Sequence, residues 1–135
     1  MKNLISFRLA SNTIIAINTM ALLMHVLILL NILPHDFVWG GRVNSEADLI
    51  ILESISIVVQ TLFIFIIAIK AGYLFIGKFK RTVTVGIWVF FGVMVLNTIG
   101  NLASSSGLET IVMTPLTIVL SLLLYRLAIE KENPQ

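Results

Sequence analysis

The chain has 135 residues, of which 58% are hydrophobic and 12% are charged. Soluble domains carry roughly twice that share of charged residues and cannot hide so much apolar surface, so the composition predicts a membrane protein. The formal charge of +2 does not indicate a nucleic-acid partner, because the cations flank apolar segments and form no basic patch. Without cysteine, disulfides and thiolate metal sites are excluded.

Four apolar segments follow one another along the chain. The first, residues 11–33, ends before Pro34, because proline cannot continue a helix. The polar segment 35–48 leads to the second span, 49–69, and the cationic segment 70–82 to the third, 83–103. A short turn leads to the fourth span, 110–129, in which Pro115 predicts a kink.

Each apolar segment is close to the roughly 20 residues with which a helix crosses a bilayer. The runs are continuous and lack the alternation of barrel strands. We therefore expect an all-α fold, a four-transmembrane-helix bundle, in which residues 1–135 form a single integral membrane domain.

The cations predict the orientation of the bundle, because lysine and arginine are retained on the cytoplasmic side. Eight of them lie near the two termini or between the second and third spans: Lys2, Arg8, Lys70, Lys78, Lys80, Arg81, Arg126 and Lys131. Arg42 alone lies in the other two connections. We expect the N-terminus and the C-terminus in the cytoplasm.

Polar residues recur on one face of each span and gather toward its outer half. The candidates for a site within the spans are His25, Glu53, Gln60, Asn97 and Asn101. Gln60 follows Glu53 by seven residues, and Asn101 follows Asn97 by four, so each pair shares a helix face. Because lipid disfavours polar groups, we expect these faces to turn toward one another.

Glu53 is the most informative of these residues. A carboxylate at the centre of a span costs about 2.5–3.5 kcal/mol to insert, and ionisable groups inside membranes commonly serve a function. Glu53 either binds a proton or a ligand, or it caps or salt-bridges the first loop at the headgroup level. Its candidate partners are Arg42, His25, Asn97 and Asn101.

Each of the other polar residues has a possible structural role as well as a possible functional one. His25 either relays protons or is a neutral imidazole hydrogen-bonded to a neighbouring helix, which we favour. We also favour interhelical hydrogen bonds over ligand contacts for Asn97 and Asn101. We expect no metal site, because no two candidate ligands have ligand spacing on a helix face, and we expect no cofactor.

The first loop carries Trp39 and Arg42 around two glycines, Gly40 and Gly41. It is either a lid, with Arg42 on an anionic group and Trp39 over an apolar body, or an interfacial turn. In the second case Trp39 lies at the headgroups, the glycines reverse the chain, and Arg42 pairs with Glu46 or Glu53.

Three segments carry a resemblance: Val38 to Arg42 (VWGGR), Glu53 to Ser56 (ESIS) and Asn97 to Asn101 (NTIGN). With them the chain is similar to a group of small bacterial four-span membrane proteins. The resemblance implies a multi-pass protein of the bacterial cytoplasmic membrane, in which the loop, Glu53 and the two asparagines form one functional unit. It implies no activity.

Three functions remain open at this point. The preferred one is a non-enzymatic protein that holds a lipid or small amphipathic ligand in an outer-half cavity lined by His25, Glu53, Gln60, Asn97 and Asn101, under Trp39 and Arg42. The alternatives are an enzyme with Glu53 and His25 as an acid/base pair, or a proton-coupled small transporter or accessory subunit. Membrane lipid is the expected partner, and a homo-oligomer or a partner membrane protein is open.

Overall fold

The computed structural model describes residues 4–39 and 42–130. Its long helices are α1 (Phe7–Leu29), α3 (Glu46–Lys70), α4 (Lys80–Leu102) and α5 (Thr114–Ala128). A short helix, α2 (Asp36–Trp39), lies between α1 and α3, and a π-helical turn, η1 (Glu109–Met113), runs directly into α5. The described residues contain no strand, so the predicted all-α class is confirmed for that part of the chain.

Four helical segments are long and apolar enough to cross a membrane: Phe7–Leu29, Glu46–Lys70, Lys80–Leu102 and Glu109–Ala128. Large apolar side chains cover their outer surfaces, among them Met20, Val58, Leu96 and Ile111. Soluble proteins rarely expose apolar patches of this extent, whereas lipid covers them. Length, composition and surface thus agree on a membrane protein, while the side that faces the cytoplasm stays a prediction.

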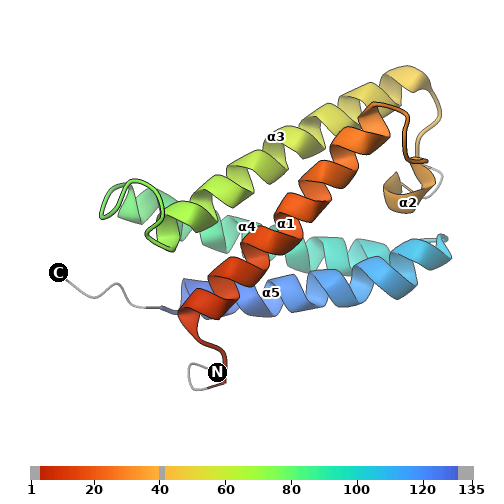
Figure 1. Ribbon diagram of the computed structural model, residues 1–135. Coiled ribbons are helices and arrows are strands. Elements are labelled where there is room, and N and C mark those ends of the chain that lie inside the picture. Colours follow the sequence, from red (N-terminus) through yellow and green to blue (C-terminus); the bar gives the residue numbers. More distant parts are fainter. Residues whose placement is uncertain (1–3, 40–41, 131–135) are drawn as a thin grey trace.

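The helices form two antiparallel hairpins, α1 with α3 and α4 with α5 (Figure 1). The start of α1, the end of α5 and the α3–α4 turn lie at one end of the molecule, and α2 and the α4–η1 connection lie at the other. The two hairpins diverge toward this second end, which we call the α2 end, and α2 lies in the opening between them (Figure 1). The short connections therefore gather the polar loops into two opposite groups.

The bounds of α1 differ from the predicted span by about one turn at each end. The Ser6 hydroxyl accepts the backbone N–H of Leu9 at 3.1 Å, which starts the helix at Phe7. At the other end Asn31 adopts a left-handed conformation with φ of 57°, and the N–H of Ile32 bonds back to the carbonyl of Leu27. This is the Schellman arrangement that ends helices, so Asn31 stops α1 before Pro34 is reached.

The same local signals bound α3. Ser45 caps its start by accepting the N–H of Asp48 at 3.1 Å, and the acidic first turn suits the positive end of the helix dipole. Gly72, with φ of 78°, ends the helix, and the N–H of Tyr73 bonds to the carbonyl of Ala68.

Pro115 disturbs the fourth segment, as its position predicts. Proline has no N–H to donate to the carbonyl of Ile111, so the regular ladder cannot continue there. Instead the N–H of Thr114 bonds to the carbonyl of Glu109, five residues back, and residues 109–113 form a π-helical turn. The regular α-helix begins only at Thr114.

The apolar core fills the end opposite α2. It joins the first half of α1, the last two turns of α3, the stretch of α4 from Val83 to Met94, and α5 from Leu120 onward. Phe63 and Phe90 stack at its centre, with ring centroids 4.2 Å apart and planes 7° from parallel.

The buried ionisable groups of the α2 end are His25, Glu53 and Glu109. Polar residues are also buried in the rest of the bundle, namely Ser11 and Asn18 of α1 and Arg126 of α5, so the predicted gathering of polar groups in one half is found only in part. Which end faces outward stays a prediction.

Candidate functional site

Glu53 is completely buried on the face of α3 that packs against α1. It lies seven residues after Glu46, about 10 Å along the helix from its start. Leu49, Phe63 and Ile67 share this buried face, so the apolar register that packs α3 also carries the carboxyl group inward. A buried carboxylate must be hydrogen-bonded or paired to be tolerated.

Two donors from different elements meet this requirement. His25 Nδ1 of α1 lies 2.7 Å from Glu53 Oε2, and the indole N–H of Trp39, from α2, donates to Glu53 Oε1 at 2.6 Å. Each oxygen of an ionised Glu53 thus accepts one hydrogen bond, which requires the His25 proton on Nδ1. Of the partners that the sequence suggested for Glu53, His25 is found, and Trp39 is the additional one.

A second buried carboxylate, Glu109, lies at the start of η1 and is 1% exposed. Its Oε2 accepts the hydroxyl of Ser104 and faces Arg42 Nη2 at 3.5 Å. Its Oε1 is buried without a hydrogen-bond partner among the described residues. Sequence reasoning missed Glu109 because the predicted fourth span begins one residue later. A usable signal was present, since Glu109 is the single charged residue between Arg81 and Arg126.

Arg42 does not have either of its predicted partners. Its guanidinium contacts Glu109, not Glu46 or Glu53. The Arg42 side chain remains 50% exposed. The segment between α1 and α3 therefore contacts a buried carboxylate of each hairpin: Trp39 donates a hydrogen bond to Glu53 of the α1–α3 hairpin, and Arg42 forms an ion pair with Glu109 of the α4–α5 hairpin. The reversal predicted at Gly40 and Gly41 lies outside the described residues.

The remaining predicted residues lie around this cluster or outside it. Gln60 is half-buried, two turns below Glu53 on the same stripe of α3. Asn101 is half-buried near the α2 end of α4, and its backbone carbonyl accepts a hydrogen bond from the Thr110 hydroxyl at 3.1 Å. Asn97, by contrast, is exposed on the outside of the bundle.

The packing of α4 explains why Asn97 faces outward. The buried stripe of this helix runs through Phe90 and Met94 to Thr98, whose hydroxyl contacts that of Thr117 on α5 at 2.9 Å. Asn97 is one residue, about 100° of helix rotation, from that stripe. The sequence predicted an inward position for Asn97 from its polarity alone. This prediction is wrong, because the apolar stripe sets the rotation of α4 and leaves Asn97 outside.

The described residues form no group of three or more His, Cys, Asp or Glu side chains that could hold a metal ion. The α2 end brings together carboxylates, an imidazole, an indole and a guanidinium. Such groups can exchange protons, accept hydrogen bonds from a ligand or neutralise its charge.

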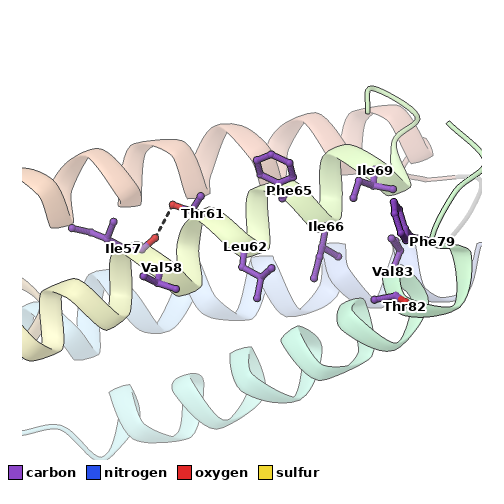
Figure 2. Close-up of a pocket in the computed structure, with 10 residues that line it drawn as sticks. All are labelled: Ile57, Val58, Thr61, Leu62, Phe65, Ile66, Ile69, Phe79, Thr82 and Val83. Atoms are coloured by element: carbon purple, nitrogen blue, oxygen red, sulfur yellow. Dashed lines mark hydrogen bonds between the residues drawn. The ribbon is translucent and has the colours of Figure 1, made fainter. Parts of the chain in front are cut away.

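An open apolar groove of about 490 Å³ lies elsewhere, between α3 and the start of α4 (Figure 2). Its lining runs from Ile57 to Ile69 and from Phe79 to Val83. The Thr61 hydroxyl in this groove already donates to the carbonyl of Ile57 at 2.8 Å, as the dashed line in Figure 2 marks. The groove therefore offers hydrocarbon contact and is separate from the polar cluster.

Comparison of the chain with protein-family models, with curated proteins and with solved structures finds no match in any of the three. The resemblance to small bacterial four-span proteins stays a prediction.

Proposed function

We propose that this chain is an integral membrane protein of the bacterial cytoplasmic membrane, with both termini in the cytoplasm, that holds a lipid or small amphipathic molecule at its α2 end. The bound molecule lies between the two hairpins and beneath the segment that carries Trp39 and Arg42. The role is one of binding rather than catalysis.

The observation that carries this proposal is the pair of buried carboxylates held by one connecting segment. Glu53 is 0% and Glu109 1% exposed, although burying a carboxylate opposes folding unless it is fully compensated. Both would be replaced by apolar residues at little loss if only packing mattered. Because one connecting segment contacts both carboxylates, through Trp39 and Arg42, a ligand that displaces either contact reaches a buried acidic group.

The exposed surface supports the amphipathic character of the ligand. Next to Glu109, the side chains of Leu108, Ile111 and Val112 are 46%, 75% and 52% exposed. A molecule with a polar head among the buried carboxylates can lay its hydrocarbon part along this surface within the lipid.

The test is native mass spectrometry of the protein extracted in nanodiscs, with Glu53→Gln beside the unmodified chain. We expect a discrete bound mass that the variant loses, because a neutral amide at this position no longer holds Trp39 with a charge-assisted hydrogen bond. Glu46→Gln is the matched control, since Glu46 is exposed at the start of α3 and its substitution removes the same charge. No bound mass in the unmodified protein, or a mass that Glu53→Gln retains, would contradict the proposal.

One observation supports a second candidate, proton-coupled transport. His25 and Glu53 lie 2.7 Å apart inside the bundle and can share a proton, and membrane carriers use such pairs as relays. Uptake driven by a pH gradient in proteoliposomes, abolished by Glu53→Gln, would favour this candidate over simple binding.

A further inference from the structure

The two buried carboxylates are satisfied to different degrees. Both oxygens of Glu53 have close donors, at 2.7 and 2.6 Å. Glu109 has the hydroxyl of Ser104 and the guanidinium of Arg42 on Oε2, while Oε1 has no partner among the described residues. An unpaired acceptor buried in a protein costs free energy that a bound donor recovers. Glu109 is therefore the carboxylate that can accept a further hydrogen bond from a ligand.

Arg42 is a weak partner for Glu109. Charge-assisted hydrogen bonds between nitrogen and a carboxylate have lengths of about 2.7–2.9 Å, whereas Arg42 Nη2 lies 3.5 Å from Oε2. Half of the Arg42 side chain is exposed, so polar solvent or headgroups can solvate the guanidinium once it leaves, whereas the buried Glu109 needs another cation in its place. Arg42 can thus leave Glu109 at little cost when another cation takes its place.

The local backbone holds Glu109 in position for such an exchange. Its carbonyl accepts the N–H of Thr114 in the π-helical turn and lies 3.5 Å from the Thr114 hydroxyl. The Thr110 hydroxyl bonds to the carbonyls of Asn101 and Ser106, which ties the turn to the end of α4. Single π-helical turns are frequent at functional sites, and here Pro115 creates one next to the buried carboxylate.

We propose that Glu109 binds the primary ammonium head of an amphipathic amine, which displaces Arg42 and donates to Oε1. An ammonium group carries one positive charge and three donors, so it replaces the charge of Arg42 and also pairs with the remaining acceptor. A quaternary ammonium supplies the charge without a donor. This inference rests on the proposed function and adds the chemical class of the ligand, whose source is either a lipid headgroup or a free amine.

The test compares decylammonium with decyltrimethylammonium on the full chain in phosphatidylcholine nanodiscs, with dissociation constants from native mass spectrometry. We expect decylammonium to bind at least about tenfold more tightly, because a hydrogen bond to a charged group is worth that factor or more. Glu109→Gln should weaken decylammonium binding by about tenfold or more for the same reason. Arg42→Gln should strengthen it by about fivefold, because it removes the competing cation.

The two variants are expected to change the dissociation constant in opposite directions. A folding defect cannot explain this pattern, since a misfolded variant does not bind more tightly. Glu46→Gln is the control and should leave the dissociation constant unchanged. In nanodiscs that contain phosphatidylethanolamine, weaker apparent binding to the unmodified chain identifies the lipid head as the source, and unchanged binding identifies a free amine.

Two results overturn the inference. One is equal binding of the two amines, and the other is decylammonium binding that is indifferent to both Glu109→Gln and Arg42→Gln. If either occurs while a co-purified mass still depends on Glu53, the inference fails and the proposed function stands. If the unmodified chain holds no molecule at all, the proposed function fails as well.

Discussion

The hydrogen bond from Trp39 to Glu53 is expected to be one of the strongest single contacts at the α2 end. Replacing Trp39 with phenylalanine keeps an aromatic ring but removes the N–H that lies 2.6 Å from Glu53 Oε1. Because Glu53 is 0% exposed in the unmodified chain, the oxygen that loses its donor is a buried acceptor without a partner. A hydrogen bond to a charged group contributes about 1.5–3 kcal/mol, and Trp39→Phe should lower the free energy of unfolding by about 2 kcal/mol.

The measurement is equilibrium unfolding in mixed micelles with increasing dodecyl sulfate, followed by far-ultraviolet circular dichroism. Trp88→Phe is the matched control, since Trp88 is 44% exposed and its ring contacts are with Phe91 and Tyr125. It removes the same atoms without touching a carboxylate, and should cost less than about 0.5 kcal/mol, as surface substitutions do.

A double-mutant cycle separates the hydrogen bond from the ring packing. In a Glu53→Leu background the carboxylate is gone, so Trp39→Phe should cost no more than the control, with a coupling energy of about 1.5–3 kcal/mol. If the two substitutions add within about 0.5 kcal/mol, the contact does not stabilise the fold and the reasoning about the α2 end is refuted.

Two further predictions concern the opposite end and the orientation. Phe63→Ala should lower the free energy of unfolding by about 3–5 kcal/mol, because Phe63 is fully buried and stacked on Phe90. Phe65→Ala is the control and should lower it far less, because Phe65 is 47% exposed. Equal losses in the same unfolding assay would refute the assigned core. Because the chain has no cysteine, single cysteines at the exposed positions of Asn44 and Lys78 can be labelled selectively in intact cells. A membrane-impermeant maleimide should label Asn44→Cys and not Lys78→Cys, and the reverse pattern would overturn the predicted orientation.

The sequence by itself determined the number of apolar segments long enough to span a membrane and part of the chemistry of the interior, since Glu109 was missed and Asn97 lies outside. Hydropathy over about 20 residues reports the cost of leaving a helix in water, and this quantity needs no knowledge of neighbours. Glu53 and His25 were identified in the same way, since an ionisable group within an apolar run is costly wherever the helix packs. The helix ends were less accurate, because the cap at Ser6 and the left-handed Asn31 moved α1 by about one turn.

Only the tertiary structure decided which of these groups meet. Trp39 and Glu53 are fourteen residues apart in the chain, and their contact depends on where α2 lies between the diverging hairpins. The pairing of Arg42 with Glu109 joins residues from opposite hairpins, and no local pattern encodes that distance. The outward position of Asn97 follows from the rotation of α4, which the packing of Phe90, Met94 and Thr98 sets. Hydropathy is a property of each segment, whereas contacts between segments depend on the packing of all of them together.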